Sequence, residues 1–218
     1  MKTDIQLKHD IEQELSFDPK INAAHVGVRV DHGAVTLMGT VDTFGEKWAV
    51  EDATRKVGCV RTIAQELTVK TISEHERTDS EIAAAVDRAL EWHVYVPASV
   101  KAIVQKGSVT LEGHAVWHYE REAAEKAVRN LRGVVQVFNA ISLKPQVSAA
   151  KLTSNVEAAL KRQSVKDAKA IQVTTQGSQV TLSGVVSSWQ AIEDANEVAW
   201  AAPGVTLVID HLTMSLSP

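Results

Sequence analysis

A Val-Thr-Leu triplet recurs three times between two glycines, and the rest of the sequence repeats in register with it. The glycine-bounded segments are Gly33 to Gly39, Gly107 to Gly113 and Gly177 to Gly184. The second glycine recurs after 74 residues and then after 71. Solenoid repeats are about 20–50 residues long, so a period of this length indicates a repeated domain. The sequence therefore predicts one small domain in three tandem copies.

The repeat sets the expected domain boundaries. We expect domain 1 over residues 1–70, domain 2 over 78–144 and domain 3 over 148–218. A domain of this size buries only about 60% of its unfolded surface, so each copy is expected to be marginally stable alone. Hydrophobic residues make up 44% and charged residues 23% of the chain, which is typical of globular proteins.

The charge balance argues against strongly electrostatic partners. The formal net charge is −4, and no copy is strongly basic. Nucleic-acid binding depends on Lys and Arg side chains that neutralise phosphates, so no nucleic-acid partner is expected. The same balance weakens any general attraction to anionic lipid.

The beginning of the chain is polar and amphipathic. Residues 3–10 contain no apolar core of about 7–15 residues, so no secretory signal is expected, and no run of about 18 apolar residues predicts a transmembrane segment. These features favour a cytoplasmic location, including a peripheral one at the inner membrane. Cys59 is the single cysteine, which excludes an internal disulfide and a cysteine-rich zinc site. Without a positioned base, its thiol is expected to be inert and partly buried.

Each copy begins with a helix pattern. A Thr or Ser is followed by apolar residues at every fourth position, which places three side chains near one helix face. The predicted core residues are Leu7, Ile11, Leu15, Ile82, Val86, Leu90, Leu152, Val156 and Leu160. Capping boxes are predicted at Thr3 and Thr78, whereas the third copy, with Ser148 as its cap, has a lysine in the box position and predicts a weaker cap.

A hairpin and a second helix follow in each copy. Alternating apolar residues predict a strand, a turn at His32-Gly33, Lys106-Gly107 or Gln176-Gly177, and a returning strand that contains the triplet. The third copy has one additional residue between the turn glycine and the triplet, which predicts a longer loop or a β-bulge. An alanine-rich amphipathic helix comes next. Its predicted buried residues are Val50, Ala53, Val57, Ala124, Ala127, Leu131, Ala195, Val198 and Ala202.

Each copy closes with a helix-ending turn and a last strand. Gly133 and Gly204 are predicted to end their helices in the left-handed conformation. Cys59 occupies the equivalent place in copy 1, where we expect Gly58 to take that conformation instead. The order helix, strand, strand, helix, strand predicts an α+β protein of three tandem αββαβ domains, each with two helices packed on one face of a three-stranded sheet.

These residues resemble the BON domain family (bacterial OsmY and nodulation). The resemblance rests on the glycine-bounded hairpin, the alanine-rich helix and a Gly-Val pair before the closing strand, seen at Gly133-Val134 and Gly204-Val205. It covers nearly the whole chain, which looks like an OsmY-like protein of three BON domains without the export signal that many relatives carry. Cys59 at a glycine position and Thr175 in the first strand depart from the pattern.

The resemblance implies a binding module and no enzyme. BON domains are regarded as modules that contact phospholipid or the cell envelope, several of them in osmotic-stress proteins, and one relative combines the domain with potassium sensing. The resemblance supplies no catalytic residue, cofactor or metal. The sequence itself contains no G-x-S-x-G, P-loop or dinucleotide fingerprint.

Two groups of residues are candidates for lipid contact. The second copy is rich in aromatic side chains with one apolar and one polar end, which suits a membrane interface and equally suits covering a small core or packing against a neighbouring copy. These residues are Trp92, Tyr95, Trp117 and Tyr119. The third copy carries a basic cluster, which is able either to hold anionic headgroups or to complement the dipole at a helix C-terminus. The cluster consists of Lys161, Arg162, Lys166 and Lys169.

The histidines of the second copy do not form a typical metal-site pattern. His114 and His118 are four residues apart, but a strand ends just before them and the next helix begins near Trp117. We therefore expect His93, His114 and His118 to be incidental surface residues and not metal ligands.

The leading functional hypothesis is a bacterial, stress-associated protein that contacts phospholipid membrane surfaces from the cytoplasmic side. The alternative is a soluble cytoplasmic scaffold or ion-sensing module, whose copies pair with one another or with partner proteins. Salt-sensitive binding to anionic liposomes favours the first hypothesis. A stable oligomer that ignores liposomes favours the second.

Overall fold

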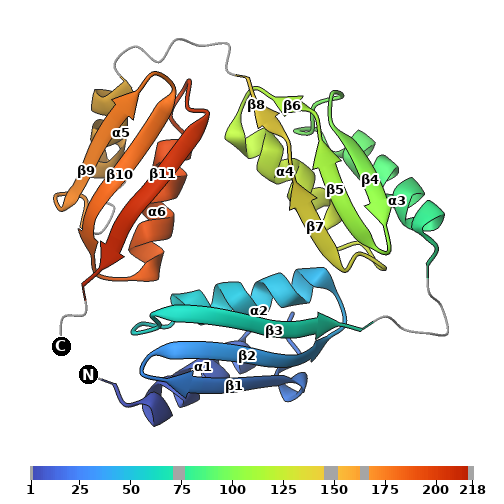
Figure 1. Ribbon diagram of the computed structural model, residues 1–218, viewed down its shortest axis with the longest axis horizontal. Helices are drawn as coiled ribbons and strands as arrows, with labels where there is room; N and C mark the ends of the chain where they lie inside the picture. The colour runs from blue at the N-terminus through green and yellow to red at the C-terminus, as the bar shows by residue number, and fades with distance from the viewer. Residues whose placement is uncertain (1, 71–76, 145–151, 163–166, 216–218) are drawn as a thin grey trace. The chain divides into compact units, whose positions relative to one another are not determined.

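The computed structural model describes residues 2–70, 77–144, 152–162 and 167–215. The same order of helix, strand, strand, helix and strand occurs three times along the chain, and each set forms its own three-stranded sheet and helix pair (Figure 1). In copy 2 two further short strands, His114–Ala115 and Ser142–Leu143, pair with each other as a separate two-stranded sheet. The α+β class and the three tandem αββαβ copies predicted from the sequence are therefore confirmed.

The elements correspond between copies. In copy 1 they are α1 (Asp4–Phe17), η1 (Ala23–His25), β1 (Val26–Asp31), β2 (Ala34–Val41), α2 (Phe44–Lys56) and β3 (Thr62–Val69). In copy 2 they are α3 (Asp79–Trp92), β4 (Lys101–Gln105), β5 (Ser108–Glu112), β6 (His114–Ala115), α4 (His118–Val128), β7 (Gln136–Asn139) and β8 (Ser142–Leu143). In copy 3 they are α5 (Leu152–Arg162), β9 (Ile171–Gln176), β10 (Gln179–Val186), α6 (Trp189–Trp200) and β11 (Leu207–Met214).

The strand with the Val-Thr-Leu triplet is the centre of each sheet. β2, β5 and β10 pair antiparallel with the strand before them and parallel with a later strand, β3, β7 and β11 respectively. Successive side chains of a strand point to opposite faces. Val35 and Leu37 are buried on the helix side, so Thr36 lies on the other face. We call this helix-free face the open face of each copy.

The first helix packs as the sequence predicts. Both helices of a copy cover the same face of its sheet (Figure 1), and all nine predicted first-helix core residues are at most 7% exposed. The capping boxes at Thr3 and Thr78 are both present. Each box satisfies N–H groups that have no partner inside the helix. The cap predicted at Ser148 lies outside the described residues.

The buried face of the second helix matches the prediction in copy 3 and differs in copies 1 and 2. Three of the predicted residues are only half-buried, namely Val57, Ala127 and Leu131. α2 ends at Lys56 and α4 at Val128, so Val57 and Leu131 lie beyond their helices. Ala202 also lies beyond the end of α6, but it is buried in the core of copy 3. In copy 2 the inward position is taken by Val128, which is fully buried, instead of Ala127.

All three hairpins close with two-residue turns, so the longer loop or bulge predicted for copy 3 is wrong. His32-Gly33 and Lys106-Gly107 have positive φ at both positions, which is the type I′ pattern. In copy 3 the turn is Gly177-Ser178, with positive φ only at the glycine, which is the type II′ pattern. The additional residue therefore moves the glycine to the first turn position and leaves the loop length unchanged.

An aspartate ties the first helix to the hairpin turn in copies 1 and 2. The Asp4 carboxylate accepts the backbone N–H groups of His32 (2.8 Å) and Gly33 (3.2 Å). Asp79 occupies the same place after its cap threonine and accepts two turn N–H groups in the same way. Copy 3 has Ala149 at this place in the sequence, outside the described residues, and its turn is of the other type.

Two predictions about Cys59 are wrong. Cys59 itself adopts the left-handed conformation (φ 79°), as Gly133 and Gly204 do (both 92°), whereas Gly58 has no positive φ. The helix-ending turn is therefore conserved in shape among the copies, even with a side chain present. Cys59 is also exposed, not partly buried.

Candidate functional site

The end of the first helix presents an exposed side chain in every copy. Phe17 and Trp92 each lie two residues after the last core leucine of their helix, and they are 84% and 85% exposed. Two helical residues correspond to a rotation of about 200°, which turns these side chains away from the core. Arg162 holds the equivalent position in copy 3 and is also exposed. The side chain at this position is not part of any core, and it is a phenylalanine in copy 1, a tryptophan in copy 2 and an arginine in copy 3.

In copy 2 the apolar surface continues past the helix end. Val94 is 85% exposed and Tyr95 is 58% exposed, directly after Trp92. We call Trp92, Val94 and Tyr95 the copy-2 tip. Two of the sequence-predicted lipid contacts, Trp92 and Tyr95, thus lie in one short segment, and both are exposed.

Backbone hydrogen bonds fix the shape of the copy-2 tip. The His93 N–H donates to the Leu90 carbonyl at the end of α3 (3.3 Å), and the Val96 N–H donates to the His93 carbonyl (2.9 Å). A further turn joins the Val100 N–H to the Pro97 carbonyl (3.0 Å). A segment held by turns loses little conformational entropy when it meets a surface.

The other two aromatic candidates lie at the start of α4. Trp117 is half-buried, and Tyr119 is 52% exposed. The Glu120 carboxylate accepts the N–H groups of Val116 (2.8 Å) and Trp117 (3.0 Å), which fixes the entry into the helix. Trp117 therefore takes part in the local packing, whereas Tyr119 presents its ring to solvent.

The basic candidates of copy 3 lie at and after the end of its first helix, as the copy-2 tip does in copy 2. Lys161 and Arg162 form the last turn of α5, and both are exposed, as is Lys169. Lys166 lies outside the described residues. The one acid of this stretch, Asp167, has its carboxylate hydrogen-bonded to the Ser187 N–H (2.8 Å). The described part of the cluster therefore presents three cations to solvent.

The candidate histidines have separate surroundings. His114 belongs to the short strand β6, and His118 is the first residue of α4. The Arg121 guanidinium lies 2.9 Å from His118 Nδ1, so that nitrogen accepts a hydrogen bond. His93 is the C-cap of α3, and its buried Nδ1 has no hydrogen-bond partner within the part of the chain that the structure describes.

A different group brings three potential metal ligands together. Ligand atoms of Asp4, Asp31 and His32 lie within 4.8 Å of one another. Both Asp4 oxygens already accept turn N–H groups, and His32 Nδ1 lies 2.6 Å from Asp31 Oδ1. These contacts account for the group as part of the hairpin turn.

Sequence reasoning missed Phe17 and Val94 as surface residues. Their exposure depends on where the first helix stops and how the chain leaves it. A signal was present for Phe17, since it follows the last core leucine by two residues, an offset that turns a helical side chain away from the buried face. No such signal exists for Val94, because α3 ends at Trp92 and the helical period does not extend to it.

Comparison with known proteins assigns the repeat. The BON domain family matches residues 3–71, 78–145 and 148–215. No curated protein matches the chain. Within the described residues, no helix has the length and apolar character needed to cross a membrane.

Solved structures show a weak likeness to proteins of secretion systems. CdsD, a structural protein of the Type III secretion system of Chlamydia trachomatis, is 11% identical over 96% of this chain and 92% of that chain, with a TM-score of 0.27. The periplasmic domain of the inner-membrane protein PrgH from S. typhimurium is 12% identical over 88% and 95%, with a TM-score of 0.24. At these TM-scores, neither structure assigns an arrangement or a partner to this chain.

Proposed function

The chain belongs to the BON domain family, in three tandem copies, and we propose that it is a non-enzymatic protein whose copy-2 tip binds the interfacial region of phospholipid membranes. The observation that carries this proposal is the 85% exposure of both Trp92 and Val94 on a segment fixed by backbone hydrogen bonds. Trp and Tyr are favoured where an apolar phase meets water. The absence of catalytic fingerprints in the sequence supports a binding role.

The binding free energy expected from the copy-2 tip alone is small, so we propose that a second contact contributes to membrane attachment. Burying one large apolar side chain contributes about 1.5–3 kcal/mol, so three partly inserted side chains supply a weak, reversible attachment. Lys and Arg near an anionic surface add about 1 kcal/mol each. Lys161, Arg162 and Lys169 are therefore proposed to strengthen attachment to anionic lipid. A role in osmotic stress is part of the proposal and rests on the family resemblance.

Flotation with liposomes tests the proposal. The wild-type chain is expected to float with vesicles of phosphatidylcholine and phosphatidylglycerol, and the triple variant Trp92→Ser, Val94→Ser, Tyr95→Ser is expected to lose at least tenfold in binding. Leu207→Ser, which removes an apolar side chain of 46% exposure from β11, is the matched control and should bind as wild type does. Equal binding by the triple variant would overturn the assignment of the tip.

The basic residues have a separate test. Lys161→Glu with Arg162→Glu is expected to weaken flotation with anionic vesicles at low salt and to leave binding to pure phosphatidylcholine unchanged, since electrostatic attraction is screened by salt. If this variant bound anionic vesicles as well as wild type does, the basic residues would have no lipid role. A chain that ignores vesicles and forms a stable oligomer in light scattering would support the scaffold function instead.

A further inference from the structure

The open face of copy 2 carries a row of apolar residues across all three strands. Ile103 on β4 pairs with Thr110 on β5, which pairs with Phe138 on β7. Ile103 is 55% exposed and Phe138 is 50% exposed. The neighbouring Val109 and Leu111 are buried on the helix side, which places this row on the face away from the helices.

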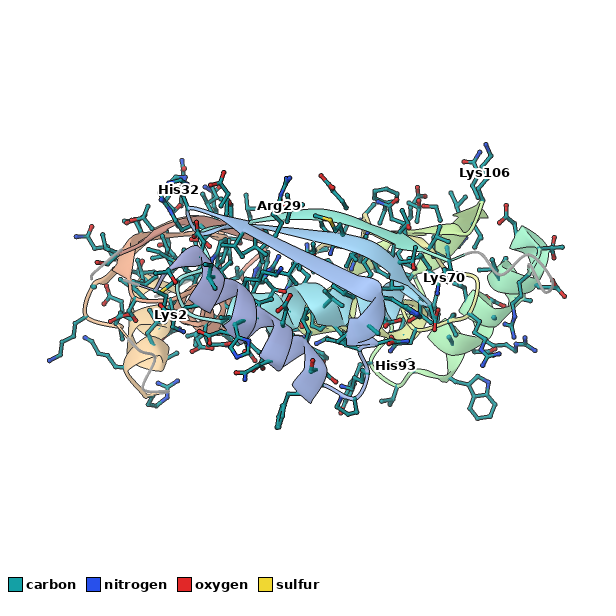
Figure 2. All side chains as sticks on the ribbon, turned by 90° about the horizontal axis from the view of Figure 1, so that it is seen from below. Lys2, Arg29, His32, Lys70, His93 and Lys106 are labelled. Carbon is teal, nitrogen blue, oxygen red and sulfur yellow. The ribbon has the colours of Figure 1, made fainter. Side chains whose placement is uncertain are left out.

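The fold does not require apolar residues at these positions. The same row in copy 1 is Arg29, Thr36 and Ala64. Figure 2 shows Arg29 on the side of the sheet opposite to α1. In copy 3 the row is Thr174, Thr181 and Ile209. Copies 1 and 3 therefore form the same sheet with at most one large apolar residue in the row, whereas copy 2 exposes two.

The residues beside the row make this face complementary to itself. Lys101 pairs with Glu112 at one end of the sheet, next to Ala140, and the other end carries only uncharged polar residues. Those polar residues are Gln105, Ser108 and Gln136. The face thus has one cation and one anion side by side and no net charge to repel an identical face.

A two-fold axis parallel to β5 and above Thr110 brings matching groups together. Ile103 then meets the partner's Phe138, and Phe138 meets the partner's Ile103. At the charged end the two Glu112 side chains face each other across the axis, and a Lys101 side chain lies on either side of them, so the two cations offset the repulsion between the two carboxylates. An arrangement in which the same patch serves both subunits is the usual form of a closed dimer.

We propose that the open face of copy 2 binds the same face of a second copy of this chain. Ordinary strand spacings give the face a size of about 15 Å by 15 Å. That is well below the roughly 800 Å² per partner of a stable complex. The association is therefore weak and reversible, and it appears only at high chain concentrations.

Sedimentation equilibrium of the full chain over a wide range of concentrations tests the proposal. The wild-type mass is expected to rise above 23.7 kDa towards twice that value. The variant Ile103→Arg with Phe138→Ala places the copy 1 residues at these positions, so the sheet is expected to fold, and it should weaken association at least tenfold. The control Thr174→Arg with Ile209→Ala makes the same change in copy 3 and should associate as wild type does. Circular dichroism verifies folding.

A charge exchange tests the two-fold arrangement. Glu112→Lys alone places four lysines together and should abolish association. Lys101→Glu with Glu112→Lys restores two pairs of opposite charge and should recover it. A wild-type chain that stays at 23.7 kDa at all concentrations, or a dimer that survives Ile103→Arg with Phe138→Ala, would overturn the proposal. If that variant instead lost vesicle binding with its mass unchanged, the face would be a lipid contact and the proposal would be wrong.

Discussion

The Asp79 carboxylate accepts the backbone N–H of Gly107 at 2.9 Å, and its other oxygen accepts the N–H of Lys106 at 2.7 Å. This contact joins the first turn of α3 to the tip of a hairpin almost thirty residues later. Hydrogen bonds from both N–H groups favour the charged carboxylate, and they hold the pKa of Asp79 below 3.8, the Gly107 bond contributing most. The helix and the hairpin are therefore coupled through one ionised side chain.

Acid is expected to weaken this coupling. Because the pKa of Asp79 is lower in the folded state than in the unfolded chain, its contribution to stability is present above pH 3.8 and is lost as the pH falls through the folded value. A carbon NMR titration of the Asp79 carboxyl should give a midpoint below 3.8. Asp79→Asn should show a smaller loss of stability between pH 5 and 2. A midpoint at or above 3.8 would contradict the coupling.

His32 is expected to titrate in the opposite sense. Its hydrogen bond and charge interaction with Asp31, followed by Asp4, raise the pKa of His32 above 6.5. The stabilising contribution is therefore present below pH 6.5 and is lost as the pH rises through the folded value. Proton NMR should show that Asp31→Asn lowers the pKa of His32, whereas Asp42→Asn, whose carboxylate lies near Lys70, should not. An unchanged His32 titration in Asp31→Asn would remove Asp31 as the cause.

Glu46 is expected to be important for the stability of copy 1. Glu46 is 9% exposed, and its carboxylate accepts the N–H groups of Asn22 and Asp42, both at 2.8 Å. Glu46→Ala removes both hydrogen bonds, and because Asn22 and Asp42 are exposed, each lost bond is expected to cost about 0.5–1.5 kcal/mol. Urea unfolding should show the loss, with Glu46→Gln less affected because an amide oxygen remains. Glu66→Ala, at an exposed position of β3, serves as the control, and an equal effect there would refute the role of Glu46.

The second glycine of the hairpin is expected to tolerate no side chain. Gly39 has φ 121°, and a Cβ there would overlap the carbonyl oxygen of His25. Strained backbone and overpacking each cost about 1–3 kcal/mol, so Gly39→Ala should unfold a marginal domain. Gly58→Ala is the matched control, because no heavy atom lies within 4 Å of the new Cβ and φ is ordinary. Thermal unfolding should separate the two, and equal melting temperatures would contradict this account.

The parts of the fold that the sequence predicted are those that depend on neighbours along the chain. The apolar stripe from Leu7 to Leu15 and the capping box at Thr3 involve contacts within four residues, so spacing alone reveals them. The Asp79 contact is different, since it joins residues 28 positions apart. One sequence signal could have revealed it, because an Asp follows the cap threonine in copies 1 and 2, whereas an alanine follows Ser148, the cap predicted for copy 3.

The sequence indicated which residues of the copy-2 tip suit a membrane interface, but it did not show that they are exposed. Trp92 and Tyr95 are recognisable from the sequence as amphipathic aromatic residues, but their exposure depends on the turn that follows Leu90. The prediction for Cys59 was wrong for a different reason. Non-glycine residues rarely adopt the left-handed conformation, so we expected the neighbouring Gly58 to adopt it in place of Cys59. Tertiary context holds the same turn in all copies and overrides the ordinary preference of a non-glycine residue.

The equivalence of Phe17, Trp92 and Arg162 has a consequence for how such a chain diversifies. Each residue follows its domain's last helical core leucine by two positions and is exposed, so its replacement requires no compensating change elsewhere in that domain. Substitution at one of these positions alters what a single repeat touches, while the remaining two keep their own preferences. The repeats of such a protein can therefore evolve different binding functions one at a time, through mutations at exposed positions that have almost no effect on folding.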